Sequence, residues 1–130
     1  MTYKEKALKL LEESGKCTVE IGKNLLELNN IFQSFDFRND VSDAFLEKIR
    51  PLLTYDVLKH IYDECEFYNT LQDPDDVIDC VKTFIERGEL SENQKNFLKY
   101  YIRTGIRKYV KEFKTNLVEF TNKCKEAGYI

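Results

Sequence analysis

The stretch from Leu98 to Ala127, LKYYIRTGIRKYVKEFKTNLVEFTNKCKEA, decides the fold class of this chain. Nine residues in it recur at a mean spacing of about 3.6, which is the period of one face of an α-helix. They are Leu98, Ile102, Ile106, Tyr109, Phe113, Leu117, Phe120, Cys124 and Ala127. The stripe predicts one long helix from Glu92 to Glu126 with this face toward a core.

The length of this helix raises a question about Gly105. A helix from Glu92 to Glu126 spans about 52 Å, whereas a compact domain of 130 residues is only about 36 Å across. The helix therefore either projects beyond the rest of the domain or bends. Gly105 is its weakest point, because glycine in a helix interior costs about 1 kcal/mol relative to alanine. The sequence leaves open a straight helix and a bend or join at Gly105.

Helix start and stop signals also divide the rest of the chain. Thr2 with Glu5 and Ser91 with Gln94 have the spacing of a capping box. Gly15 fits the residue that follows a helix C-terminus. No segment alternates apolar and polar residues for long enough to predict a strand. We therefore expect a single all-α domain over residues 1–130, a bundle of about five to six helices.

Four further helices are predicted between these signals. One runs from about Thr18 to Gln33, with Cys17 at the start of its apolar stripe, and a short one covers about Val41 to Ile49 before Pro51. Thr54 can cap the next helix. The last begins near Asp73 and is closed by Gly88.

The amino-acid composition limits the classes of protein to which this chain can belong. Hydrophobic residues make up 42% of the chain and charged residues 33%, as in ordinary folded soluble domains. No apolar run approaches the roughly 20 residues that a membrane span needs, and the N-terminus lacks the apolar core of a signal peptide. Four cysteines are scattered singly, which favours reduced thiols. These features predict a cytoplasmic protein without a membrane span.

The stretch DPDDVIDC, residues 73–80, contains a D-D-x-x-D pattern that can bind magnesium. Asp is a preferred N-cap, proline is tolerated at the first helical position, and carboxylates are favoured in the first turn of a helix. Asp73, Asp75 and Asp76 fill such positions, and only Asp79 is left over. We therefore interpret the stretch as a helix N-terminus and expect no metal or other cofactor.

One resemblance keeps a catalytic alternative open. Small all-α nucleotide pyrophosphohydrolases carry E-x-x-E on one helix and E-x-x-D on the next. The nearest match here is Asp63 with Glu66 followed by Asp76 with Asp79, and the first pair departs from the pattern at its first residue. The resemblance implies Mg²⁺-dependent hydrolysis of a nucleotide by these four carboxylates.

His60 is the only histidine of the chain. With Asp56 and Glu64 it forms an i, i+4, i+8 row that can hold a metal, but no second histidine or suitably spaced cysteine supports a zinc site. Cys65 would lie about 140° from His60 around a helix, too far to pair with it. We therefore expect the cysteines to be packing residues and the protein to have no catalytic residue.

Charge is distributed unequally along the chain. Residues 1–94 hold 11 Lys and Arg against 20 Asp and Glu, a net charge of −9. Residues 95–130 hold 9 against 3, a net charge of +6, and the two parts sum to −3. Such asymmetry is typical of a chain with an interacting tail or patch.

On a helical wheel five cations of the last helix lie together, away from its apolar stripe. They are Arg103, Arg107, Lys108, Lys111 and Lys114. Phe97 and Tyr100 fall among them, and cations interleaved with exposed aromatic rings can bind single-stranded nucleic acid. The sequence therefore predicts a binding face within residues 95–114.

An acidic segment offers the opposite charge. Between His60 and Val81 there is no Lys or Arg. The candidate binding residues there are Asp63, Glu66, Asp75, Asp76 and Asp79. This segment can pair with the basic helix within one chain or across a homodimer, or it can mimic nucleic-acid phosphates toward a basic partner.

These features favour a non-catalytic cytoplasmic protein that binds a larger protein partner as a regulator or inhibitor. The abundance of Lys, Asn, Ile and Tyr fits an AT-rich genome, and short acidic helical proteins are frequent among phage and mobile-element inhibitors. Two alternatives stay open, the Mg²⁺-dependent hydrolase and a nucleic-acid-binding protein that uses residues 95–114. The sequence pI of about 5.3 argues against the latter.

Overall fold

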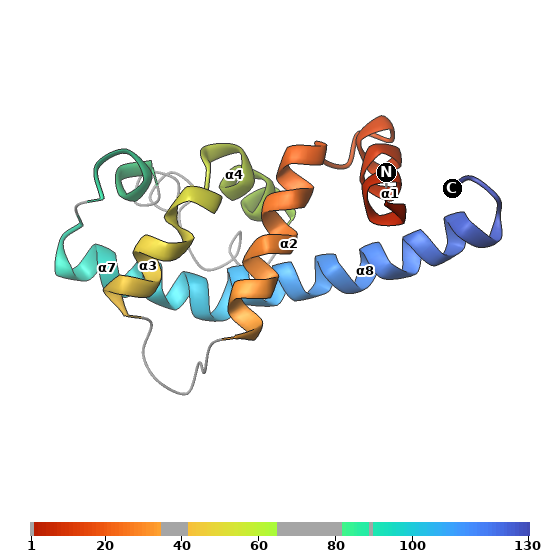
Figure 1. Cartoon of the computed structure of the whole chain (residues 1–130). Helices are drawn as coiled ribbons and strands as arrows, with labels where there is room; N and C mark the ends of the chain where they lie inside the picture. Colours follow the sequence, from red (N-terminus) through yellow and green to blue (C-terminus); the bar gives the residue numbers. More distant parts are fainter. Residues whose placement is uncertain (1, 35–41, 65–81, 89) are drawn as a thin grey trace.

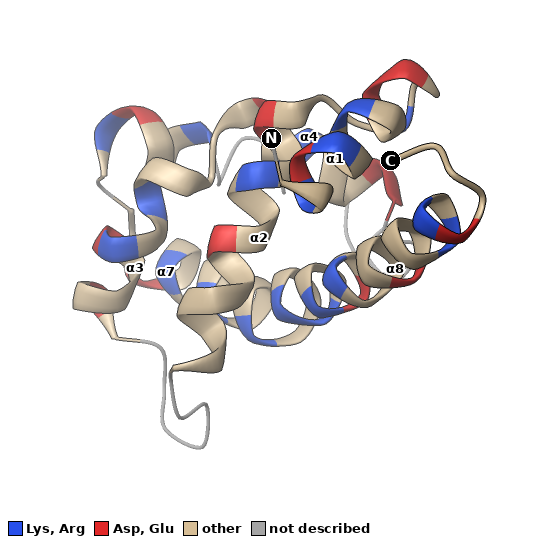
Figure 2. Cartoon of the chain, turned by 45° about the vertical axis from the view of Figure 1, so that its right-hand side comes forward, with Lys and Arg blue, Asp and Glu red and all other residues tan. Residues whose placement is uncertain are grey.

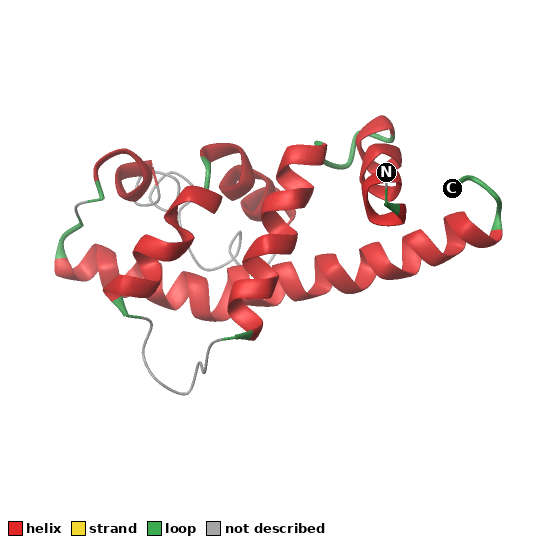
Figure 3. Ribbon diagram, in the orientation of Figure 1, coloured by secondary structure: helices red, strands yellow, loops and turns green. Residues whose placement is uncertain are grey.

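The computed structural model describes residues 2–34, 42–64, 82–88 and 90–130. All regular structure in these residues is helical, and they contain no strand (Figure 3). The elements are α1 (Tyr3–Glu13), α2 (Val19–Gln33), α3 (Asp43–Ile49), the 3₁₀ turn η1 (Arg50–Leu52), α4 (Tyr55–Glu64), a helical segment over residues 82–87, α7 (Glu92–Tyr101), the π turn η2 (Ile102–Ile106) and α8 (Arg107–Glu126). The prediction of an all-α bundle is confirmed. None of the described helices is long and apolar enough to cross a membrane.

The C-terminal helix is the longest element and runs without interruption through α7, η2 and α8 (Figure 1). α1 and α2 pack against α8. In Figure 1 the distal part of α8 continues beyond α2, with α1 beside it, and both chain termini lie at that end. Nζ of Lys125 lies 4.3 Å from the ring centre of Tyr3 there. The long helix therefore projects past the main body, as its length requires.

Gly105 does not separate two helices, so of the alternatives left open by the sequence the structure does not adopt a join at this residue. The helix instead widens into the π turn η2, in which the backbone N–H of Arg107 donates to the carbonyl of Ile102, five residues earlier. A π turn takes up more residues per turn than an α-helix, so it rotates the helix before it relative to the helix after it. The irregularity thus lies at Gly105, but as an insertion within one helix.

The π turn changes which residues of α7 are buried. Tyr101 is fully buried although it lies outside the predicted stripe, and Phe97 packs against the core. The Phe97 and Tyr101 rings stack with centres 6.5 Å apart and planes 11° apart. The prediction that Phe97 is exposed among the cations is therefore wrong, because the sequence wheel assumed α-helical rotation throughout.

The capping signals are largely where the sequence places them. Oγ1 of Thr2 accepts from the backbone N–H of Glu5 at 3.2 Å. Ser91 and Gln94 form a reciprocal capping box, with Ser91 Oγ accepting from Gln94 N–H at 3.3 Å and Gln94 Oε1 accepting from Ser91 N–H at 2.9 Å. The predicted start of a helix at Asp73 lies outside the described residues.

The turn between α1 and α2 positions part of the site described below. Gly15 has φ +78°, and the N–H of Lys16 donates to the carbonyl of Leu11 at 3.1 Å, which closes α1 with a left-handed residue. Thr18 then caps α2, its Oγ1 accepting from Ile21 N–H at 3.1 Å. Cys17 therefore precedes α2 and is not part of its helical stripe, contrary to the prediction.

Buried side chains of the described residues form two clusters. The larger one draws on α2, α3, Leu53 directly after η1, α4, residues 82–87, α7, η2 and the first turn of α8. The smaller one consists of Ala7, Leu8, Leu26 and Leu117, with four partly buried residues around it. Phe113 packs against both clusters. α2 and α8 therefore hold the two parts of the core together.

Candidate functional site

The basic face, defined as Arg103, Arg107, Lys108, Lys111 and Lys114, lies on the C-terminal helix. The first four side chains are exposed and Lys114 is half-buried. Figure 2 shows Lys and Arg recurring along α8. Nearby Tyr100 is 42% exposed. These predicted residues therefore lie along one helix, at positions that its core contacts leave accessible.

The cations nearest the start of this helix are already paired. Nζ of Lys95 lies 3.7 Å from Oδ2 of Asp43, and Nζ of Lys99 lies 3.5 Å from Oδ1 of the same carboxylate. Asp43 belongs to α3, so these cations meet a carboxylate outside the acidic segment proposed from the sequence. Lys95 and Lys99 therefore help to hold α3 on α7.

The cations of the basic face differ in whether they interact with other residues of the chain. Arg103 and Arg107 take part in interactions within the chain. For Lys108, Lys111 and Lys114 the structure gives no carboxylate within 4 Å among the residues it describes. These three lysines are the part of the face that can bind a new partner.

Most residues of the acidic segment lie outside the part of the chain that the structure describes. Asp63 is exposed near the C-terminus of α4. Glu66, Asp75, Asp76 and Asp79 lie outside the described residues. Pairing with the basic helix, phosphate mimicry and the four-carboxylate hydrolase site all stay predictions.

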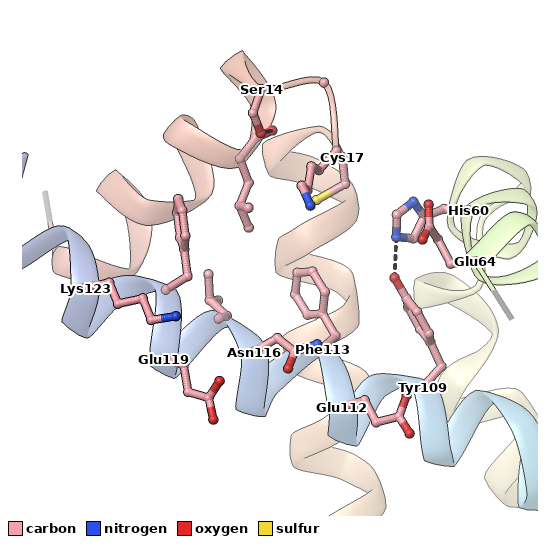
Figure 4. A pocket seen from close by; sticks show the side chains of 15 residues that line it. Ser14, Cys17, His60, Glu64, Tyr109, Glu112, Phe113, Asn116, Glu119 and Lys123 are labelled. Carbon is pink, nitrogen blue, oxygen red and sulfur yellow. Dashed lines mark hydrogen bonds between the residues drawn. The ribbon is translucent and has the colours of Figure 1, made fainter.

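A cavity of about 920 Å³ lies where the α1–α2 turn, α4 and α8 meet (Figure 4). Its apolar lining comes mainly from α8, and its rim carries charged side chains of both signs. The apolar residues are Leu11, Phe113, Leu117 and Phe120, and the charged ones are Lys16, Glu64, Glu112, Glu119 and Lys123. A second cavity of about 460 Å³ shares Gly15, Lys16, Cys17 and His60 with it.

His60 and Tyr109 form a hydrogen bond in the wall of the larger cavity. His60 Nε2 lies 2.6 Å from Tyr109 Oη, and the two rings meet edge to face with centres 5.6 Å apart. The bond joins α4 to α8 across 49 positions of the sequence. Burial lowers the pKa of His60 below its ordinary value and outweighs the opposing effects of Glu64 and Asp63. The imidazole is therefore neutral at pH 7.

Cys17 lines the same cavity wall as His60. Burial raises the pKa of its thiol above the ordinary value of 9.0, and the carboxylates of Glu12 and Glu64 raise it further. A cysteine nucleophile needs the thiolate, which this environment disfavours. Cys17 and the neutral His60 therefore do not form a thiolate–imidazolium pair.

The possible metal row is not supported. Among the described residues, no group of three or more His, Cys, Asp and Glu side chains is arranged to hold a metal ion. Asp56, His60 and Glu64 all belong to the described residues. Their helical spacing places them along one side of α4 without converging their ligand atoms on one point.

The sequence did not predict that Cys17, His60 and Tyr109 line the same cavity. The sequence places Tyr109 on an apolar stripe and predicts a packing role for Cys17, and neither residue is near His60 in sequence. Only the polar atoms of His60 and Tyr109, each of which needs a partner when buried, hinted at such a pair.

No protein-family model, curated protein or solved structure matches the chain.

Proposed function

We propose that this protein is a non-catalytic binding protein of the cytoplasm that docks onto an acidic surface of a larger protein and thereby regulates or inhibits it. The contact is made by the basic face of the C-terminal helix. The observation that carries the proposal is the exposure of Lys108 and Lys111 on α8, with no carboxylate within 4 Å in the described part of the chain.

The pairing of α7 with Asp43 provides a local example of this chemistry. One carboxylate lies within 3.7 Å of both Lys95 and Lys99, which are four positions apart. Residues three or four apart share one side of a helix. Lys108 and Lys111 are three apart, so a carboxylate of a partner can approach both in the same manner.

Two further observations favour a protein partner over nucleic acid. Phe97 is packed against the core, so Tyr100 is the exposed ring that remains of the two aromatic residues expected among the cations. Binding of single strands depends on several stacking rings along a basic groove. The net charge of −9 over residues 1–94 also repels a polyanion that approaches from most directions.

The environment of the cavity supports a binding role. A nucleophilic cysteine requires a lowered pKa, whereas burial and carboxylates raise that of Cys17. His60 is held by its hydrogen bond to Tyr109, at 2.6 Å. We assign both residues to the architecture of the cavity and give neither a catalytic step.

Affinity capture from the native cell tests the proposal with matched variants. Tagged wild-type chain is compared with Lys108→Glu/Lys111→Glu and with Lys4→Glu/Lys23→Glu, which makes the same change of net charge on exposed positions of α1 and α2. We expect the first variant to lose a protein that both the wild type and the control retain. Retention of that protein by both double variants would contradict the proposal.

Two purified-protein measurements separate the alternatives. A salt-sensitive submicromolar complex with a generic single-stranded oligonucleotide, abolished by Lys108→Glu/Lys111→Glu, would replace the protein partner with nucleic acid. Self-association in sedimentation experiments that the same variant abolishes would make the partner a second copy of this chain. We expect neither oligonucleotide binding nor self-association, and we expect the basic face to capture a protein.

A further inference from the structure

The cavity beside α8 has features that the proposed function does not use. Its volume of about 920 Å³ lies within the range of roughly 300–1,000 Å³ common among small-molecule sites. Lys108 and Lys111 do not line it. It is therefore a second candidate site, separate from the basic face.

Aromatic rings supply much of its apolar surface. Tyr109 and Phe113 lie with ring centres 6.4 Å apart and planes tilted by 31°, and Phe120 lines the cavity further along α8. The faces of such rings attract cations. The lining therefore suits a ligand that carries both an apolar body and a positive charge.

The charges of the cavity are arranged unevenly. In Figure 4 the carboxylate of Glu64 lies beside His60 at one end, and Lys123 lies at the other end. The charged groups that act on His60 and Cys17 are the carboxylates of Glu12, Asp63 and Glu64. Lys16 also lines the cavity beside Cys17, but over the whole lining the carboxylates of Glu64, Glu112 and Glu119 outnumber the ammonium groups of Lys16 and Lys123.

The hydrogen bond between His60 and Tyr109 leaves a polar atom at this end. Nε2 of the ring is bonded to Tyr109, and the described residues give Nδ1 no partner. A neutral imidazole has one donor and one acceptor nitrogen. With Nε2 as the donor, Nδ1 can accept a hydrogen bond from a ligand N–H.

We infer that the cavity binds a small organic ammonium ion. Its charged group lies at the end formed by Glu64 and His60, and its apolar body covers Phe113 and Phe120. The occupant is a free small molecule, and the inference does not rest on the basic face or on any protein partner.

Three probes that share a phenyl body but differ in charge test this inference. Benzylammonium, benzyl alcohol and benzoate are titrated into the full chain at neutral pH and low salt, with NMR signals of the Tyr109 and Phe113 rings as the readout. We expect benzylammonium to bind about tenfold more tightly than benzyl alcohol, and benzoate more weakly than either. Equal affinities, a preference for benzoate, or no shift of these signals would overturn the inference.

Glu64→Gln tests whether the charge at this end decides the preference. Glu64 is exposed, so the variant is expected to fold. Glu27→Gln, an exposed position of α2 that does not line the cavity, makes the same change of charge as a control. The preference for benzylammonium over benzyl alcohol should fall to about threefold or less in Glu64→Gln and persist in Glu27→Gln. Identical preferences in the two variants would refute the assigned position of the cation.

Discussion

The two halves of the C-terminal helix share one apolar period but lie in different surroundings. In the half that precedes Phe113, Leu98, Ile102, Ile106 and Val110 are 0% exposed and belong to the larger cluster. In the half that follows, Leu117 and Cys124 are the buried residues, and Leu117 clusters with Ala7 and Leu8 of α1 and Leu26 of α2. The first half therefore anchors the fold. The same half also carries Arg103, Arg107, Lys108 and Lys111 of the basic face on its exposed side.

Truncating one buried side chain in each half should show most clearly that the two halves contribute differently to stability. Ile106→Ala opens a cavity inside the larger cluster and should lower the free energy of unfolding by about 4 kcal/mol, whereas Leu117→Ala, next to half-buried Phe113 and Phe120, should cost about 2 kcal/mol. Urea denaturation of the two variants provides the comparison. Equal losses would show that the helix is anchored evenly along its length.

The contact of α2 with α1 should tolerate little added volume. A Cβ at Gly22 would lie 2.5 Å from Leu8 Cδ2 and 3.6 Å from Phe113 Cζ, and Leu8 is 1% exposed. Gly22→Ala should therefore destabilise the protein by about 1–2 kcal/mol in spite of the better helix propensity of alanine.

A double-mutant cycle isolates the cause of this effect. In a Leu8→Ala background the space is open, so Gly22→Ala should instead stabilise by up to about 1 kcal/mol. The same sign in both backgrounds, measured by urea denaturation, would show that Leu8 does not limit the packing at Gly22.

Asn29 lies on α2 and is the one buried polar residue among the described side chains. Its Nδ2 has no hydrogen-bond partner in the described part of the chain. Asn29→Leu removes this unsatisfied group at similar volume and should stabilise the protein by about 1 kcal/mol. Asn30→Leu, at the exposed neighbouring position, should change stability by about 0.5 kcal/mol or less. Thermal and urea denaturation that rank the two variants in the opposite order would contradict this assignment.

The hydrogen bond between His60 and Tyr109 predicts a small dependence of stability on pH. Burial lowers the pKa of His60 in the folded chain below 6.5, its ordinary value, so folding favours the neutral imidazole. Its contribution is complete above about pH 6.5 and is lost as the pH falls from there through the lower pKa of the folded state. The free energy of unfolding should therefore fall more steeply between pH 7.5 and about 5.5 in the wild type than in His60→Gln. Parallel curves for the two proteins would show that His60 titrates alike in both states.

Local signals were sufficient to predict much of this fold. Capping at Thr2 and Ser91 depends on residues three positions apart, and the stripe of the C-terminal helix repeats within one element. The basic face was predicted for the same reason. By contrast, the burial of Tyr101 and Phe97 depends on the π turn, which has no clear signature in the residues from Ile102 to Ile106.

The candidate cavity was not predictable, because it is made by tertiary packing. Cys17 reaches it through a turn between helices, and His60 meets Tyr109 across 49 positions of the chain. Periodicity assigned Cys17 and Tyr109 to apolar stripes and could not show which polar atoms they would approach. Helical patterns describe faces within one element, whereas this site needs three elements.

Hydrogen exchange of the captured complex tests the central claim most directly, because it locates the contact without any substitution. Amide exchange is followed by mass spectrometry for the chain alone and for the complex isolated from the native cell. We expect slower exchange in the complex over residues 107–118, which contain Lys108, Lys111 and Lys114, and unchanged exchange over residues 92–101. Protection confined to other parts of the chain, with residues 107–118 exchanging as in the free protein, would contradict a partner bound through the basic face.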